Sequence, residues 1–137
     1  MAAVVAQVDD EMAMKAQHAG AQADDAWGAL LAQGLAYIEL ALDSEIQRIV
    51  LLDGPAVLGD PSQWPSQSAC LEETRRALGE LREAGIVRGM DIEAAARLLN
   101  GAALNAALWV AASEAPQKTL PKAIEALTCL ASGFRAR

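Results

Sequence analysis

Few side chains in this sequence could carry out chemistry, and they are scattered along the chain. Two pairs of neighbouring acids, Asp9–Asp10 and Asp24–Asp25, could supply a general acid and a general base. His18, the only histidine, could ligate a metal or stand at the mouth of a ligand cavity. Solvation or helix capping explains the two acid pairs. His18 is favourable at the C-terminal end of a helix, and the sequence around it contains no further ligands in a metal-binding motif. We therefore predict no catalytic site, no metal site and no cofactor.

The two cysteines, Cys70 and Cys129, could act as nucleophiles, disulfide partners or metal ligands. Neither belongs to a C-x-x-C motif and both lie in apolar helical patterns, so we predict reduced, buried thiols in a cytoplasmic protein. The chain contains no G-x-S-x-G, H-E-x-x-H or glycine-rich phosphate motif. We do not expect an enzyme; the enzymatic alternative is a small helical protein whose acids meet only in three dimensions.

Length, composition and charge favour a single all-α domain over residues 1–137. Alanine and leucine dominate while β-branched and aromatic residues are scarce, which favours helices over sheets. A net charge of −7 argues against direct binding of nucleic acid, because contacts with phosphates require clustered lysines and arginines. The sequence has no run of about 18 apolar residues and no basic start before an apolar signal core, so no membrane partner is expected.

Apolar residues recur at helical spacing and predict a bundle of about six helices. The run from Arg48 to Trp64 is apolar on every side and breaks twice at glycine and proline. This pattern is typical of a buried segment, and we call the run the hub. Ser44 and Gln47 form a capping box at its start. The other predicted helices are the first one, up to Gly20, then the run from Asp24 to Leu42, the run from Ala69 to Gly85, and the last two, Asp91–Ser113 and Thr119–Arg135. The polar stretch from Pro61 to Gln67 is either a loop or a frayed helical start around Trp64.

Three runs carry a resemblance to a known family: LLDGPAVLG with a tryptophan a few residues later, CLEETRRALGELREAGI, and ARLLNGAALNAAL. Together they resemble the C-terminal regulatory domain of TetR-type transcriptional repressors over most of the chain. One departure is that Asn105 stands one place later than the asparagine of the relatives, and no glutamate follows it. No role is therefore carried over to Asn105.

The resemblance implies a DNA-binding helix-turn-helix unit ahead of the first helix. The apolar stripe of Val4, Val8 and Met12 begins without a Ser, Thr, Asp or Asn cap, which is typical of a helix that has lost its beginning. An excised domain given a starting methionine and a natural truncation both explain this. DNA is then a partner only through the missing unit, and this chain is the effector-binding and dimerisation half of the regulator.

The predicted helix Asp91–Ser113 carries surplus apolar surface, because it bears no charge between Arg97 and Glu114. Left exposed on a monomer, that surface would form an unusually large apolar patch. We therefore predict a homodimer in which the last two helices of each chain form a four-helix interface, and the resemblance implies the same pairing. The predicted interface residues are Ala95, Leu98, Gly101, Ala102, Ala106, Ile124, Leu127 and Ala131.

Large or polar residues on inward-facing stripes are the candidates for a ligand site. If a cavity exists, it should lie between the second helix, the hub and the long helix that follows Ser68. It should bind a small, mostly apolar or aromatic effector, because few charges point inward. The alternative is a dimerisation module with a filled core and no ligand. The candidate lining residues are Trp27, Leu31, Tyr37, Trp64, Cys70, Thr74, Asn105 and Trp109.

Overall fold

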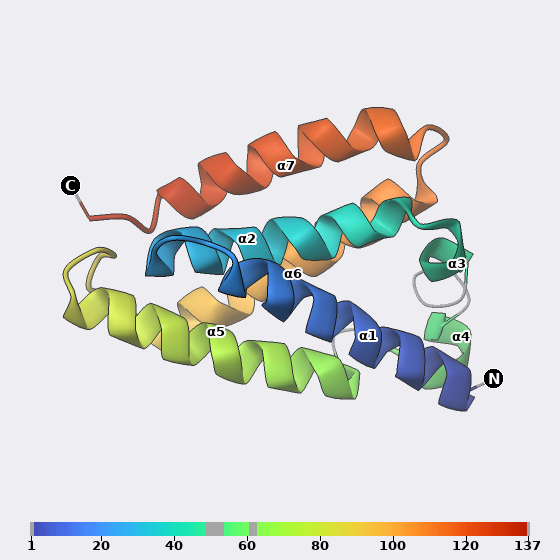
Figure 1. Cartoon of the computed structure of the whole chain (residues 1–137), viewed down its shortest axis with the longest axis horizontal. Helices are drawn as coiled ribbons and strands as arrows, with labels where there is room; N and C mark the ends of the chain where they lie inside the picture. Colours follow the sequence, from blue (N-terminus) through green and yellow to red (C-terminus); the bar gives the residue numbers. More distant parts are fainter. Residues whose placement is uncertain (1, 49–53, 61–62, 137) are drawn as a thin grey trace.

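The chain folds into a bundle of helices (Figure 1). The computed structural model describes residues 2–48, 54–60 and 63–136. The elements are α1 (Ala2–Ala21), α2 (Ala26–Glu39), the 3-10 turn η1 (Leu40–Leu42), α3 (Ser44–Ile46), α4 (Gly54–Leu58), α5 (Pro65–Glu83), α6 (Ile92–Ala112) and α7 (Pro116–Ser132). The predicted all-α fold is confirmed: within the described ranges, the only β-type pairing is an isolated bridge between Val87 and Arg135.

Helix α2 lies at the centre of the bundle. It contacts α1, α5, α6 and α7, and Figure 1 shows α7 on one side of it, α1 and α5 on the other, and α6 behind. The sequence of α2 explains this position, because Glu39 at its last residue is its only charged side chain. A helix that is apolar on nearly every face is stable only when other elements cover it.

Aspartates cap two of the long helices, where the predicted starts are confirmed. The Asp25 carboxylate accepts a hydrogen bond from the Gly28 amide at 2.6 Å, and the Asp91 carboxylate accepts one from the Ala94 amide at 2.8 Å. Each bond satisfies an amide that has no partner inside the helix. These two caps determine where α2 and α6 begin.

The short helix α3 is capped one residue earlier than predicted. The Asp43 carboxylate accepts hydrogen bonds from the amides of Glu45 at 2.9 Å and Ile46 at 3.2 Å. The predicted capping box of Ser44 and Gln47 is therefore wrong. Asp43 has the extended backbone of a cap residue, and an aspartate in that position is at least as good a cap as a serine.

Prolines begin both α5 and α7. Helix α5 starts at Pro65, directly after Trp64, which agrees with a helical start around Trp64 and not with a loop up to Gln67. Helix α7 starts at Pro116, earlier than the predicted Thr119, and neither helix has a side-chain cap. Proline is favourable in the first turn because its missing amide hydrogen would have no helical partner there, and its φ angle already matches a helix.

The buried core has two parts that meet at α2 and α6. The larger part lies between α1, α2, α6 and α7 and contains the fully buried side chains of Met12, Ile38 and Val110. The smaller part lies where α5 packs on the start of α6, around Leu78 and Leu81. The two parts together pack against α2 and against the inner side of α6.

Much of the predicted hub, including residues 49–53 and 61–62, lies outside the described residues. Of the part that is described, Gly54 is buried and Trp64 is 2% exposed. The remaining described residues are half-buried or exposed, so the prediction of a run buried along its whole length is wrong: Arg48, Pro55, Ala56, Gly59, Asp60 and Gln63. The Trp64 indole Nε1 donates a hydrogen bond to the Gly59 carbonyl at 3.1 Å, so the polar atom of this buried ring is satisfied.

After α7, the C-terminal tail lies at the end of the bundle where α2 begins and where α5 is connected to α6. The Arg88 amide, between α5 and α6, donates a hydrogen bond to the Phe134 carbonyl at 2.8 Å. The Arg135 guanidinium lies over the Trp27 ring, 5.3 Å from its centroid, which is a cation–π distance. The tail after α7 therefore restrains Trp27 at the start of α2.

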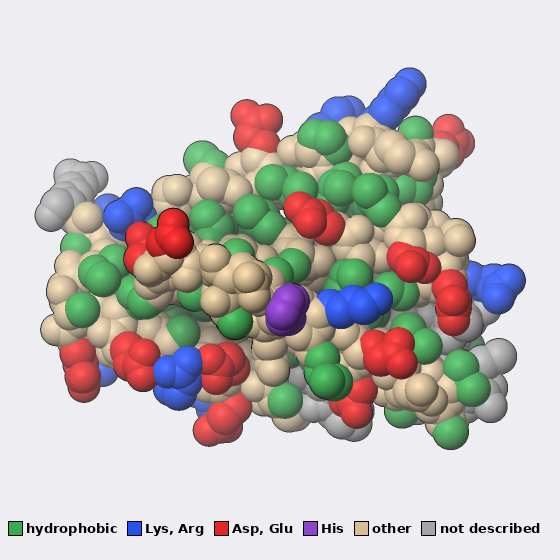
Figure 2. Space-filling view, viewed as in Figure 1, with side chains coloured by type: hydrophobic (Ala, Val, Ile, Leu, Met, Phe, Trp, Pro, Cys, Tyr) green, Lys and Arg blue, Asp and Glu red, His purple; other side chains and the backbone are tan. Residues whose placement is uncertain are grey.

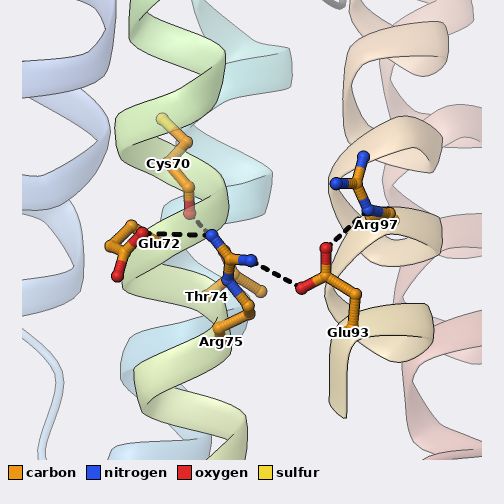
Figure 3. A network of polar contacts seen from close by, with 6 residues as sticks. All are labelled: Cys70, Glu72, Thr74, Arg75, Glu93 and Arg97. Atoms are coloured by element: carbon orange, nitrogen blue, oxygen red, sulfur yellow. Dashed lines mark hydrogen bonds and ion pairs between the residues drawn. The ribbon is translucent and has the colours of Figure 1, made fainter. Parts of the chain in front are cut away.

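An ion-pair network connects α5 to α6 (Figure 3). Arg75 reaches across to Glu93 at 2.6 Å and also contacts Glu72 at 3.0 Å, and Glu93 receives a second bond from Arg97 at 2.7 Å. These side chains are largely in solvent, so each pair adds little to stability. Their effect is on position, because they hold the two helices together beside Thr74.

Candidate ligand-binding site

A cavity lies between α1, α2, α5, α6 and α7, beside the central helix. Its volume is about 60 Å³. A buried water needs about 10–15 Å³ of such space, so the cavity has room for roughly four to six waters or an organic group of similar size. The core is therefore not completely filled at this point.

Apolar side chains form most of the cavity wall, and small residues create the space. Gly34 of α2 faces Leu127 of α7, where a Cβ atom on Gly34 would lie 3.7 Å from Leu127 Cδ2. This is an ordinary contact, so the glycine leaves room that a methyl group could occupy. The apolar lining consists of Ala16, Trp27, Leu30, Leu31, Gly34, Leu99, Ala103, Leu127 and Ala131.

Tyr37 brings a hydroxyl group to the cavity. Gln67 Nε2 donates a hydrogen bond to its oxygen at 3.1 Å. Burial, followed by the negative charge of Asp9, raises the pKa of Tyr37 well above its ordinary value. The phenol therefore keeps its proton at neutral pH and can still donate a hydrogen bond of its own.

Thr74 and Asn100 form a second polar group between α5 and α6. The Thr74 hydroxyl lies 2.8 Å from the Cys70 carbonyl and 2.9 Å from Asn100 Oδ1. Asn100 Nδ2 is buried, and within the described part of the chain it has no hydrogen-bond partner. An unsatisfied buried donor is costly, on the order of 1–3 kcal/mol. The atom has almost no accessible surface, so it lies within the packing between α5 and α6 and is not exposed to the cavity.

Asp9 lies inside the bundle, not on a solvated surface as predicted. Its exposed fraction is 2%, whereas its neighbour Asp10 is exposed. Asp9 lies on the same inward stripe of α1 as Met12, because residues three apart share a helix face. Its negative charge adds to burial in raising the pKa of Tyr37 and of Cys70, with burial the larger cause for both. The electrostatic environment around the cavity is therefore negative.

The rim of the cavity is polar. Gln17 is exposed, while Gln33 and Glu73 are half-buried, and all three line the cavity. Glu73 accepts a hydrogen bond from Arg76 Nε at 3.2 Å, and the bonds from Arg76 lower the pKa of Glu73. Figure 2 shows acidic and basic side chains mixed over this face, with His18 at the surface. His18 lies in the last turn of α1, as the sequence predicted, and does not line the cavity.

The structure brings some of the predicted lining residues together and separates others. Trp64 is buried at the start of α5, away from the cavity lining, and Asn105 and Trp109 are exposed on the outer side of α6. The predicted residues that do surround the cavity are Trp27, Leu31, Tyr37, Cys70 and Thr74.

Asn100 and Gln67 line the cavity and were not predicted. Asn100 and Asn105 are five residues apart on α6, so their side chains point roughly 140° apart around the helix axis. Only one of them can face the interior. Asn100 is the inward-facing one, because Ala96 and Ala103, which lie four residues before it and three residues after it on the same face of α6, are both buried.

Gln67 and Asn100 also line a second, more open depression, which reaches Gly101 on the outer side of α6. These two side chains are shared by the cavity and the depression, so they lie between the interior and the outer face.

The outer sides of α6 and α7 carry exposed apolar side chains. Leu98 and Trp109 of α6 are 71% and 51% exposed, and Leu130 of α7 is 60% exposed. Gly101 is exposed as well, and Ala102, Ala106 and Ile124 are half-buried. Five of the predicted interface positions are therefore at least partly accessible on the surface of the chain: Leu98, Gly101, Ala102, Ala106 and Ile124.

Three other predicted interface residues face the interior, and their assignment is corrected. Ala95 belongs to the smaller core, and Leu127 and Ala131 are 4% and 2% exposed and line the cavity. On α6 both faces are apolar, so the helical repeat did not indicate which face is the interior. On α7 the single apolar stripe that contains Leu127 and Ala131 packs against the bundle. Cys129, predicted to be buried, is likewise exposed.

Residues 2–48, 54–60 and 63–136 contain no cluster of three or more His, Cys, Asp or Glu residues placed to hold a metal ion. In the same ranges, no helix has the length and apolar character needed to cross a membrane.

A bundle of helices around a small cavity, with exposed apolar side chains on its last two helices, is an architecture used by helical ligand-binding domains. The family model of the tetracyclin repressor-like C-terminal domain matches residues 27–134. The crystal structure of a TetR-family transcriptional regulator from Pectobacterium atrosepticum superposes with a TM-score of 0.90 at 39% sequence identity, covering 99% of this chain and 70% of that chain. No curated protein matches the sequence. The chain belongs to the TetR family of transcriptional regulators and carries the C-terminal domain.

Proposed function

We propose that residues 1–137 form one domain that binds a small, mostly apolar effector in the cavity beside α2. The observation that supports this most strongly is the unfilled space among the helices, with mostly apolar walls and a few polar groups. Space in an apolar core costs stability. A bound molecule would remove that cost.

A thermal-shift screen against small apolar and aromatic compounds tests this proposal. A compound that binds only the folded state raises the apparent stability, by about 2.7 kcal/mol at a concentration one hundred times its dissociation constant. We expect compounds of this class to raise the melting temperature. A screen without any stabilising compound would favour the alternative, a dimerisation module that has no ligand.

We also propose that the domain forms a homodimer through the outer sides of α6 and α7. The supporting observation is the exposure of Leu98, Trp109 and Leu130, since large apolar side chains on neighbouring helices are typical of an interface. The charged residues of the chain are largely absent from this part of α6, where Arg97 is followed by no charge up to Ala112.

Sedimentation equilibrium tests the homodimer. Leu98→Glu introduces a charge at an exposed position, so it should leave the protomer folded while splitting the dimer. Met14→Glu is the matched control, because Met14 of α1 is 67% exposed but lies on a different helix. A monomeric unmodified chain at tens of micromolar, or equal effects of the two substitutions, would contradict the proposed interface.

The remaining part of the proposal concerns DNA. In the full regulator, effector binding would control a helix-turn-helix unit, while residues 1–137 alone would not bind the operator. The net charge of −7 supports this. A mobility-shift assay across salt concentrations should detect no complex with this chain, and tight, salt-sensitive binding would refute this part.

A further inference from the structure

The cavity is smaller than a molecule the size of an aromatic ring requires. Its volume is about 60 Å³, whereas an engineered protein cavity that holds benzene measures about 150 Å³. A molecule of ring size therefore binds only if part of the wall moves outward. The part that moves should be the one that frees the most space and is packed least tightly.

Trp27 meets both conditions. It has the largest side chain of the cavity lining, and it is half-buried. Three apolar residues of the lining are packed more deeply, namely Leu30, Ala103 and Leu127, at 7%, 8% and 4% exposed. Trp27 also lies in the first turn of α2, while those three lie farther inside their helices. Helix ends open at a lower free-energy cost than helix interiors, so Trp27 is the wall residue that moves most easily.

Arg135 lies over the ring of Trp27. Its guanidinium is 5.3 Å from the centroid of the indole, which is a cation–π distance. Arg135 is exposed and does not line the cavity, so it contacts the ring from the solvent side. A Trp27 ring that moves away from the cavity loses this contact. The contact therefore favours the position in which Trp27 closes the cavity.

The backbone around Arg135 is fixed to the connection between α5 and α6. The Arg88 amide donates a hydrogen bond to the Phe134 carbonyl at 2.8 Å, and the Ala136 amide donates one to the Ile86 carbonyl at 2.9 Å. Arg88 Nε also donates to the Arg135 carbonyl at 3.2 Å. Figure 1 shows the end of α7, the start of α2 and this connection at the same end of the bundle. The Arg135 side chain thus extends from a fixed backbone, and only that side chain has to turn away when Trp27 moves.

We infer that Trp27 is a gate in the wall of the cavity, and that Arg135 is a positioning residue that holds this gate closed. A molecule of ring size displaces Trp27 and breaks its contact with Arg135, whereas a smaller one binds without moving it. This inference rests on the proposed function of the cavity and adds a conformational step to it. A cation–π contact at an exposed site corresponds to a factor of about two to five in an equilibrium constant, which sets the size of the expected effect.

Xenon and benzene test the dependence on size, because both are apolar and xenon is the smaller. Titrations followed in ¹H–¹⁵N spectra of the unmodified chain give a dissociation constant for each probe. Both probes should shift the amide resonances of Gly34 and Ala103, which line the cavity. The side-chain Nε–H resonance of Arg135 carries a ring-current shift from Trp27. This shift should be lost when benzene binds and kept when xenon binds.

Arg135→Gln removes the cation while the backbone contacts of the tail remain. The variant should bind benzene about two- to fivefold more tightly than the unmodified chain, and its dissociation constant for xenon should be unchanged. Lys122→Gln is the matched control, because Lys122 is an exposed cation on α7 that does not line the cavity. It should change neither dissociation constant.

Trp27→Leu shows whether Arg135 acts through the indole ring. Leucine is smaller than tryptophan, so this variant should bind benzene more tightly than the unmodified chain. Adding Arg135→Gln to it should have no further effect, because the contact that Arg135 makes is already absent. If Trp27→Leu does not fold, the comparison of Arg135→Gln with Lys122→Gln decides.

The outcomes separate the gate from the cavity. If Arg135→Gln leaves benzene binding unchanged or weakens it, or alters the binding of both probes equally, Arg135 does not hold a gate, while the cavity remains a binding site. If xenon binds and benzene does not, Trp27 does not open. If neither probe binds up to its solubility limit, the proposed function of the cavity fails together with the gate.

Discussion

Filling the cavity from within should stabilise the domain. Ala103 of α6 is 8% exposed and lines the cavity, so Ala103→Leu places three additional carbon atoms in the empty space. At about 0.8 kcal/mol per buried carbon, the gain is about 2.4 kcal/mol. Fixing the leucine rotamer costs roughly 0.5–1 kcal/mol, which leaves a net stabilisation of roughly 1.5–2 kcal/mol.

Thermal unfolding followed by circular dichroism, at a fixed protein concentration, measures this effect. For a chain of this size, about 3–5 °C per kcal/mol gives a rise in melting temperature of roughly 5–10 °C. Ala69→Leu is the control because Ala69 is exposed on α5, and it should change the melting temperature little. If the core were filled at this point, the added carbons would overpack it and destabilise the protein by about 1–3 kcal/mol. A fall in melting temperature would therefore refute the cavity.

Three further predictions concern single groups. Asp91→Ala removes the hydrogen bond from the Asp91 carboxylate to the Ala94 amide at the start of α6, and urea unfolding should record a loss of about 1 kcal/mol. The pKa of Tyr37 is raised in the folded state, so the folded chain holds the phenol proton above pH 10 while the unfolded chain releases it. Stability should be unaffected by this group below pH 10 and fall above it, by up to about 1.4 kcal/mol per pH unit, and Tyr37→Phe should remove that part of the fall in alkaline unfolding curves. Cys129 is exposed whereas Cys70 is partly buried with a raised pKa, so iodoacetamide at neutral pH should modify Cys129 first in mass spectrometry; faster modification of Cys70 would contradict its placement.

The fold was largely predictable because its signals are local. One-sided apolar repeats and aspartate caps act within a few residues, and they identified α2 and α6 together with their starts at Asp25 and Asp91. The start of α5 was left open and the start of α7 was placed too late, because a proline in the first turn of a helix is also a common residue in loops. Local signals of this kind specify helices but not how the helices are rotated against each other.

The candidate site depends on that rotation, and its prediction was correspondingly incomplete. Cys70 and Thr74 were found because they are four residues apart on one face of α5. Asn105 was chosen in place of Asn100 because α6 is apolar on both faces, so the pattern does not indicate which asparagine is inside. Asp9 was assigned to the surface because a charged residue usually lies there, and only the packing of α1 on the bundle places it inside.

The three tryptophans allow the most direct test of the proposal that the cavity binds the effector. Trp27 lines the cavity, Trp64 is buried elsewhere with its indole N–H bonded to Gly59, and Trp109 is exposed on the outer side of α6. Their indole resonances in a ¹H–¹⁵N spectrum therefore report on three separate places. Titration with a compound that stabilises the domain should shift the Trp27 indole resonance most. A shift confined to Trp109 or Trp64, with Trp27 unchanged, would contradict the cavity as the effector site.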